Sequence, residues 1–245
     1  MIELRMARGS TTGPILAQLL RERGIELGTS NTEAVVSYGV PVQTSLPCLN
    51  ANAGRINKFE ELNKLQDAGI LVPYHSLDGS GLNFPILGRK FKHSKGRDII
   101  PILQNDQEFQ WRKAGGHSDF FVSYIPRHTE YRVWAYRRQR LGVYEKVMAR
   151  PKEYSRIGAN YQNGFSFQFV PAPGEEIWRL GVNAVDALGL DFGAADILVD
   201  TQNRPWVLEV NTAPGQEEAR AGLTNLANKI TRWRELGFPK RRGAE

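Results

Sequence analysis

The sequence predicts an α+β fold, in which antiparallel hairpins and amphipathic helices are mixed along the chain. Two segments, 131–148 and 192–210, read as pairs of strands around short polar turns. Apolar residues recur at helical spacing in other segments, most clearly at 175–188 and 217–236. Because strands and helices do not alternate regularly, a doubly wound parallel sheet is disfavoured for most of the chain.

The composition is that of a globular protein that can bury a core. Hydrophobic residue types make up 41% of the 245 residues, and charged types make up 24%. The apolar runs are far shorter than the ~20 residues that a membrane-spanning helix needs, and the N-terminus lacks the apolar core of a signal peptide. Cys48 is the only cysteine, so no internal disulfide can form. We therefore expect a cytoplasmic protein without a membrane partner.

The first fifty residues are predicted to form a small β-α-β unit. Residues 2–8 and 34–38 read as short strands. Pro14 stands at the start of an amphipathic helix, and Gly24 ends it. This unit is short for a free-standing domain, and we expect it to precede a larger body.

A second helix is predicted to begin at Lys58. Asn57 precedes it as an N-cap, and Glu60 stands where a capping box needs an acidic side chain. Gly69 ends this helix, and the chain continues with extended segments. These are expected at residues 70–74, 84–92, 98–103 and 120–125.

The C-terminal half is predicted to hold two hairpins and two helices. The first hairpin turns at residues 138–141, and the second turns at residues 200–203. Gly189 ends the helix that lies between the hairpins. In chain order the elements are 131–137 and 142–148, 175–188, 192–199 and 206–210, and 217–236.

The sequence divides into three expected parts: a short N-terminal β-α-β segment and two α+β subdomains, the second of which ends in the last helix. Their boundaries are expected at 1–50, 51–126 and 127–245.

The strongest chemical signal lies in the second hairpin. Asp196 lies in its first strand, and Glu209 and Asn211 lie two residues apart in its second strand. Alternation along a strand puts the last two side chains on one face, and the turn brings Asp196 beside them. Oxygen ligands of this kind suit a hard cation such as Mg²⁺. The alternative is a hairpin with solvent-exposed acids, but its apolar residues indicate that at least one side is buried.

Residues 192–215, FGAADILVDTQNRPWVLEVNTAPG, resemble the C-terminal signature of the ATP-grasp superfamily. The spacing is most similar to that of ribosomal-protein glutamate ligases and related carboxylate–amine ligases, and the similarity extends over about residues 48–216. The resemblance implies two α+β subdomains that bind ATP between them. It also implies that Asp196, Glu209 and Asn211 hold Mg²⁺, for which Mn²⁺ could substitute, against the β- and γ-phosphates.

Residues of the first subdomain match phosphate-binding positions of this family. Lys58 matches a basic residue at a helix start, although a surface lysine would look the same. A second lysine of the family falls at Arg89, with Lys90 beside it. Strand alternation places Arg89 and Lys90 on opposite faces, so we expect only one of them to contact ATP. The turn at 93–98 resembles a flexible phosphate-binding loop, but it contains a single glycine.

The resemblance also extends to the adenine and ribose positions. The backbone of Ser123, Tyr124 and Ile125 matches the segment that pairs with adenine, and a plain core strand is the alternative. Glu130 matches a residue that approaches the ribose hydroxyls.

Three residues are candidates for catalysis. Arg132 and Lys146 match cationic positions near the transferred phosphoryl group, and Asn211 would act there too. Glu130 and Arg132 stand two residues apart on one strand, and the alternative for both is a cross-strand ion pair. Asn163 would lie in a substrate loop, or it is a simple turn residue.

The resemblance implies an ATP-dependent ligase that forms an amide bond through an acyl phosphate. We expect an amino acid, a peptide or a protein as acceptor. An acidic acceptor would suit a group of arginines on and beside the first hairpin: Arg127, Arg137, Arg138 and Arg140. The alternative is a kinase of a small molecule or protein that uses the same site. The two differ in whether ADP release needs an amine.

The net charge of +6 favours anionic partners such as nucleotide phosphates or acidic peptides. Nucleic acid is a disfavoured partner because the sequence contains no recognisable nucleic-acid-binding motif. The oligomeric state is left open, as are the identities of the carboxylate and the amine.

Overall fold

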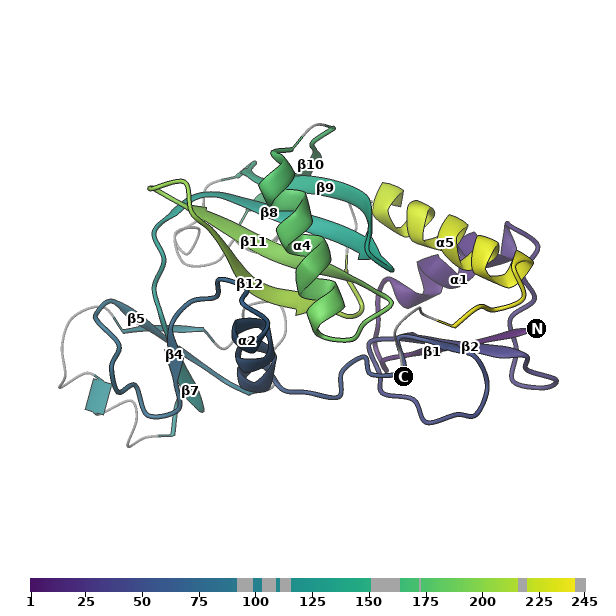
Figure 1. Cartoon of the computed structure of the whole chain (residues 1–245), viewed down its shortest axis with the longest axis horizontal. Coiled ribbons are helices and arrows are strands. Elements are labelled where there is room, and N and C mark those ends of the chain that lie inside the picture. The colour runs from purple at the N-terminus through teal and green to yellow at the C-terminus, as the bar shows by residue number, and fades with distance from the viewer. Residues whose placement is uncertain are drawn as a thin grey trace.

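A computed structural model describes residues 1–91, 99–102, 109–110, 116–150, 164–171, 173–215 and 220–240. Three separate sheets are present in this part of the chain, together with helices packed on them (Figure 1). The sheets have three, four and five strands. The predicted α+β class is confirmed. No helix of the described ranges is both long and apolar enough to cross a bilayer.

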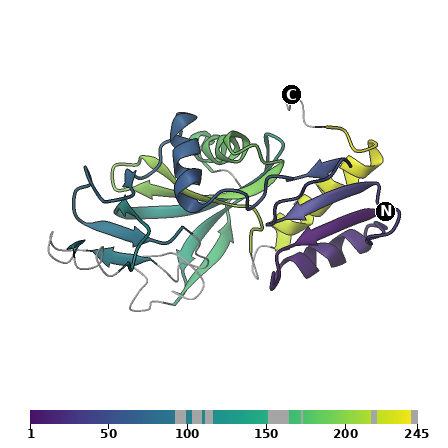
Figure 2. The same ribbon diagram turned by 90° about the horizontal axis from the view of Figure 1, so that it is seen from below.

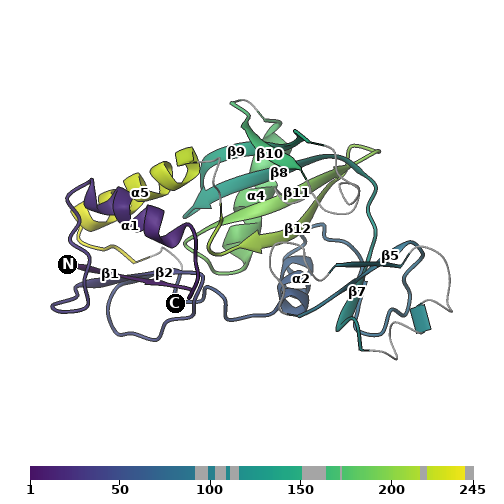
Figure 3. The same ribbon diagram turned by 180° about the vertical axis from the view of Figure 1, so that it is seen from behind.

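The N-terminal sheet is parallel and has the order β1-β2-β3. Helix α1 (Gly13–Arg21) connects β1 to β2, so the expected β-α-β unit is present, and its short third strand was not expected. The C-terminal helix α5 (Arg220–Glu235) lies beside α1 on the same side of this sheet (Figures 1 and 3). The two ends of the chain therefore share one hydrophobic core. The strands are β1 (Ile2–Met6), β2 (Ala34–Tyr38) and β3 (Cys48–Leu49).

The four-stranded sheet is antiparallel, with the order β4-β7-β5-β6. Helix α2 (Lys58–Asp67) precedes it and begins with the predicted capping box. Asn57 Oδ1 accepts from the N–H groups of Phe59 and Glu60 at 2.9 and 3.0 Å, and the Asn57 N–H donates to Glu60 Oε2 at 3.0 Å. The strands are β4 (His75–Ser76), β5 (Ile86–Arg89), β6 (Ile100–Ile102) and β7 (Phe120–Ser123).

The central sheet has five antiparallel strands in the order β10-β9-β8-β11-β12. Both predicted hairpins are present, and the edge strand β10 was not predicted. Figure 2 shows this sheet between the other two, seen from below. The strands are β8 (Arg127–Tyr136), β9 (Gln139–Met148), β10 (Phe165–Phe169), β11 (Phe192–Asp200) and β12 (Pro205–Asn211).

The first hairpin turns earlier than the sequence indicates. Its turn is formed by Arg137 and Arg138, whose φ angles of 43° and 64° are positive, and not by residues 138–141. Gln139 already belongs to β9. Ion pairs hold both turn residues: Arg137 Nε lies 2.9 Å from Asp191 Oδ1, and Arg138 Nε lies 3.0 Å from Asp186 Oδ1. These contacts stabilise a conformation that arginine rarely adopts.

The two faces of the central sheet differ. One face carries Val133, Ala195 and Ile197 into a core beneath helix α4 (Glu175–Ala187). On the other face, Trp134 and Phe192 pack against the N-terminal unit and α5. That second face also carries polar side chains, and one of them, Glu209, meets Arg89 of the four-stranded sheet.

Two backbone N–H groups of strand β12 donate hydrogen bonds to helix α2 and to the loop after it. The Val207 N–H donates to the Leu71 carbonyl at 2.9 Å, and the Val210 N–H donates to Glu61 Oε1 at 2.7 Å. Both N–H groups point away from β11, on the outer side of the last strand of the sheet. At Val207 and Val210, the exposed edge of β12 is therefore hydrogen-bonded to the preceding part of the chain.

Candidate functional site

Strands β11 and β12 place the three predicted metal ligands together. Asp196 is the direct register partner of Glu209, and Asn211 is the partner of Ala194. Directly opposed residues of antiparallel strands point to the same face, and so do residues two apart on one strand. The three side chains therefore share one face of the hairpin, as the sequence predicted. The Asn211 Nδ2 atom is buried and has no hydrogen-bond partner among the residues that the structure describes.

Asp196 is bound by two cations. Arg132 Nε and Nη2 donate to its Oδ1 and Oδ2 at 2.6 and 2.7 Å, and Lys146 Nζ donates to Oδ2 at 2.9 Å. Burial alone would raise the pKa of Asp196, but the charges of Arg132 and Lys146 outweigh burial and hold this pKa below its usual value. Asp196 is therefore an ionised carboxylate inside the protein.

Lys146 joins Asp196 to Glu130. Its ammonium group also donates to Glu130 Oε1, and Arg127 Nη1 lies 3.7 Å from Glu130 Oε2. Burial lowers the pKa of Lys146, but the charges of Asp196 and Glu130 reverse this effect and raise it. Burial raises the pKa of Glu130, and the nearby charge of Asp196 adds to that rise against the effect of Lys146. Glu130 on β8 thus pairs with Lys146 on β9, and Arg132 on β8 pairs with Asp196 on β11. These are cross-strand ion pairs, as the alternative interpretation had it.

Glu209 is paired with cations from two other elements. Lys58 Nζ, at the start of α2, lies 3.3 Å from Glu209 Oε2, and Arg89 Nη2, at the end of β5, lies 3.5 Å from the same oxygen. Lys90 points elsewhere, toward Asp119 at 3.1 Å. Of the two adjacent basic residues, the structure places Arg89 in this cluster.

Two side chains of the cluster were not predicted from the sequence. Glu61 is 6% exposed and contacts Lys58. The Phe167 ring lies beneath Arg132 and Lys146, with its centroid 4.8 Å from Arg132 Cζ and 5.9 Å from Lys146 Nζ. A signal for Phe167 was available, because phenylalanine alternates with polar residues along Phe165–Phe169 as in a strand. Glu61 lies three residues after Lys58, one helical turn away, which places it beside that lysine.

The segment expected to bind adenine lies at the end of β7. The Ser123 N–H donates to the Tyr74 carbonyl at 2.8 Å, and the Tyr124 N–H donates to the Pro85 carbonyl at 3.1 Å. These two N–H groups are therefore used inside the sheet. Residues 93–98 and Asn163, the expected loops, lie outside the described residues.

The arginines expected to suit an acidic acceptor make contacts within the protein. Arg137 and Arg138 are the paired residues of the first turn. Arg127 lies over the Phe165 ring at 4.6 Å, and Arg140 lies over the Trp178 ring at 5.6 Å. The acidic acceptor stays a prediction that these contacts do not support.

The donor set fits a divalent cation that arrives with a polyphosphate. It offers carboxylate oxygens and an amide, the ligands of hard cations. No group of three or more His, Cys, Asp or Glu residues that could hold a metal by itself exists in the described part of the chain. Cations of the protein already balance both carboxylates, so a metal ion needs an accompanying anion that binds those cations. The buried Asn211 Nδ2 atom, for which the described part of the chain offers no acceptor, leaves a donor for such an anion.

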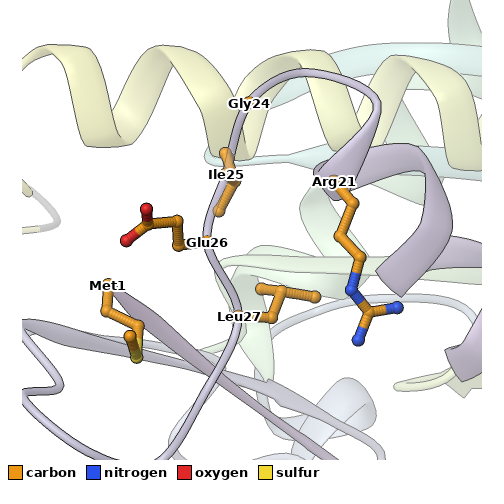
Figure 4. A pocket seen from close by; sticks show the side chains of 6 residues that line it. All are labelled: Met1, Arg21, Gly24, Ile25, Glu26 and Leu27. Carbon is orange, nitrogen blue, oxygen red and sulfur yellow. The ribbon is translucent and has the colours of Figure 1, made fainter.

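A hollow of about 630 Å³ lies far from this cluster, beside the N-terminus. It is lined by Met1, by Arg21 at the end of α1 and by residues 24–27, and Figure 4 shows these side chains spread around it without converging. Arg21 and Glu26 are its charged lining residues. This hollow contains none of the predicted site residues.

The comparisons with known proteins bear on the fold of the chain. No family model matches the chain. A D-alanine–D-alanine ligase of Methylacidiphilum infernorum is 34% identical over 106 residues, which cover 38% of this chain and 35% of that protein. A second such ligase, from Bordetella avium, is 50% identical over 42 residues, 17% of this chain and 13% of that protein. The chain thus spans at most about a third of the length of these curated relatives.

Solved structures match over nearly the whole chain. The ATP-grasp ligase PsnB in complex with a minimal precursor has a TM-score of 0.70 at 13% identity, with 94% of this chain and 97% of that chain covered. A D-alanine–D-alanine ligase from Bacillus anthracis has a TM-score of 0.68 at 14% identity, with 96% and 98% covered. At such low identity, this likeness shows the fold.

Proposed function

Because the chain has the ATP-grasp fold, we propose that it is an ATP- and Mg²⁺-dependent ligase that joins a carboxylate to an amine. One observation carries the proposal. Asp196 and Glu209 lie opposite each other and are surrounded by cationic side chains from four elements. This arrangement is suited to a metal-bound polyphosphate, whose negative oxygens can replace the protein carboxylates as partners of those cations. The cations are Lys58, Arg89, Arg132 and Lys146.

We assign the roles as follows. Asp196, Glu209 and Asn211 hold the metal, which is Mg²⁺, with Mn²⁺ as a substitute, and which neutralises phosphate charge when bound. Lys58 and Arg89 bind phosphate oxygens. The segment 123–125 receives the adenine through its backbone, and Glu130 approaches the ribose.

Arg132 and Lys146 act at the reacting centre. A carboxylate oxygen of the substrate attacks the γ-phosphorus of ATP, and the bond to the β-phosphate oxygen breaks, which gives an acyl phosphate and ADP. The amine then attacks the acyl carbon, inorganic phosphate leaves with the bonding electron pair, and the amine loses a proton to solvent. Both steps place negative charge on phosphoryl oxygens, and fixed cations beside them lower the barrier.

Structures of the same fold support these ligands. PsnB has been solved with Mg and ADP, and with a precursor peptide and AMPPNP. The ligase from Bacillus anthracis has been solved with ATP. We accordingly propose an amino acid, a peptide or a protein as acceptor.

The experiment is ADP release with Mg²⁺ and ATP against a panel of amino acids and peptides. We expect release that requires both an amine and a carboxylate, and a loss of at least about 100-fold in Glu209→Gln. Glu176→Gln removes an equal charge from the exposed first turn of α4 and should behave as wild type. Repeated ADP release without an amine, together with a stable phosphorylated product, would instead identify a kinase, and wild-type turnover in Glu209→Gln would contradict the assignment.

A further inference from the structure

Glu61 is a buried carboxylate to which the proposed chemistry assigns no role. It lies on α2 beside Leu62 and Leu65, which pack into the core, and only 6% of it is exposed. An ionised carboxylate is costly to bury unless charges and hydrogen bonds compensate it. Packing alone would be served better by an apolar residue at this position. The partners of Glu61 therefore indicate its purpose.

One oxygen of Glu61 binds the strand that carries the predicted metal ligands. Glu61 Oε1 accepts a hydrogen bond of 2.7 Å from the backbone N–H of Val210. Val210 stands between Glu209 and Asn211 in the edge strand β12, and its N–H points outward, away from β11. The bond fixes the backbone at the point from which both side chains project.

The other oxygen of Glu61 binds a predicted phosphate ligand. Lys58 Nζ lies 3.3 Å from Glu61 Oε2, and the same ammonium group lies 3.3 Å from Glu209 Oε2. Lys58 is thus held between two carboxylates. If Glu209 turns to a metal ion, Glu61 remains as the partner that keeps Lys58 in place.

We infer that Glu61 is a positioning residue, which sets Lys58 and the Glu209–Asn211 backbone for a magnesium-bound nucleotide. This inference rests on the proposed function. Glu61 would raise the affinity for the nucleotide without contacting it. It would act through Lys58 on α2 and through the Val210 backbone on β12. A purely structural Glu61 would influence the stability of the protein and leave that affinity unchanged.

The test is the dissociation constant of Mg-ADP, measured by calorimetry on the full chain. Glu61→Gln keeps an acceptor for the Val210 N–H but presents no charge to Lys58, and we expect roughly tenfold weaker binding. Asp67→Asn removes a charge from the exposed end of the same helix and should bind as wild type. In a Lys58→Gln background, Glu61→Gln should weaken binding by much less, because it acts through that lysine.

A lower melting temperature of Glu61→Gln with an unchanged dissociation constant would overturn the inference. If this variant does not fold, Glu61→Asp replaces it. Its shorter side chain keeps the charge but cannot reach both Val210 and Lys58, so we expect measurably weaker binding, and equal affinity would overturn the inference. A wild-type protein that binds no Mg-ADP would instead contradict the proposed function itself.

Discussion

Arg132 and Asp196 face each other across β8 and β11, and the guanidinium group binds both carboxylate oxygens. The Nε–Oδ1 and Nη2–Oδ2 distances are 2.6 and 2.7 Å. A third donor of the same side chain, Nη1, reaches the Gly215 carbonyl at 3.1 Å. The planar arginine group therefore fixes a carboxylate and the turn after β12 together.

Replacing Arg132 with lysine should reduce kcat/KM by at least about 100-fold, because an ammonium group cannot reproduce a two-point contact. The measurement is ADP release under saturating Mg²⁺, with circular dichroism to verify the fold. Arg179→Lys, which changes an exposed pair on α4, is the matched control. A loss smaller than about threefold would show that the second contact is dispensable.

Magnesium and ATP should bind together and poorly apart. Internal cations already compensate Asp196 and Glu209, so Mg²⁺ alone meets competition, and ATP alone meets carboxylates beside its phosphates. Near 100 times the dissociation constant, the pair should raise the melting temperature by about 5–10 °C. Either ligand alone should shift it by about 1 °C or less, with EDTA present when ATP is added alone.

The thermal-shift experiment has its control in Glu209→Gln, which should lose the joint shift. A full shift with Mg²⁺ alone would mean that the metal site exists before the nucleotide arrives. That outcome would contradict the exchange of partners on which the proposed function depends.

Gly181 of α4 packs directly on the central sheet. A Cβ atom at this position would lie 2.4 Å from Val133 Cβ. Although alanine favours a helix by about 1 kcal/mol over glycine, overpacking costs about 1–3 kcal/mol, so Gly181→Ala should lower the free energy of unfolding. Urea denaturation measures the change. Combined with Val133→Gly, which removes the clashing Cβ atom, the added methyl group should fit, and the double variant should be at least about 1 kcal/mol more stable than the sum of the single effects.

Tyr38 should make the free energy of unfolding depend on pH in the alkaline range. Burial raises the pKa of Tyr38 to about 12. A pKa that is higher in the folded state contributes stability that is complete below the unfolded value of about 10 and is lost as the pH rises toward the folded value. Between pH 8 and 11, Tyr38 ionises in the unfolded chain but not in the folded protein. The free energy of unfolding of wild type should therefore fall by about 1.4 kcal/mol more than that of Tyr38→Phe.

The comparison between Tyr38→Phe and wild type separates this residue from other buried groups, which titrate alike in both proteins. The Tyr38 hydroxyl donates to the Pro214 carbonyl at 2.8 Å, so the variant should be about 1 kcal/mol less stable at pH 8. The stability difference should close near pH 11. A constant difference in urea denaturation at both pH values would contradict the raised pKa.

The second hairpin could be predicted from the sequence because its information is local. Alternation and a polar turn are enough to place Glu209 and Asn211 on one face with Asp196. The capping box at Asn57 is equally local. By contrast, the cations of the site come from α2, β5, β8 and β9, so their meeting depends on how the sheets are arranged.

Two further features depended on tertiary contacts. Strand alternation separates Arg89 from Lys90, but only the position of Glu209 shows which of them faces the cluster. The turn at Arg137 and Arg138 lacks the glycine or asparagine that positive φ angles favour. Asp191 and Asp186 hold it, and neither is close to it in the sequence.

The two bonds from β12 to the preceding chain constrain how the sheets can move relative to each other. Leu71 and Glu61 hold β12 at Val207 and Val210, and the chain runs directly from them into β4. Any rotation of the four-stranded sheet that preserves both bonds must have its axis through these two points. Displacement then grows with distance from β12, while Lys58 and Glu209 stay close to the axis and keep their separation.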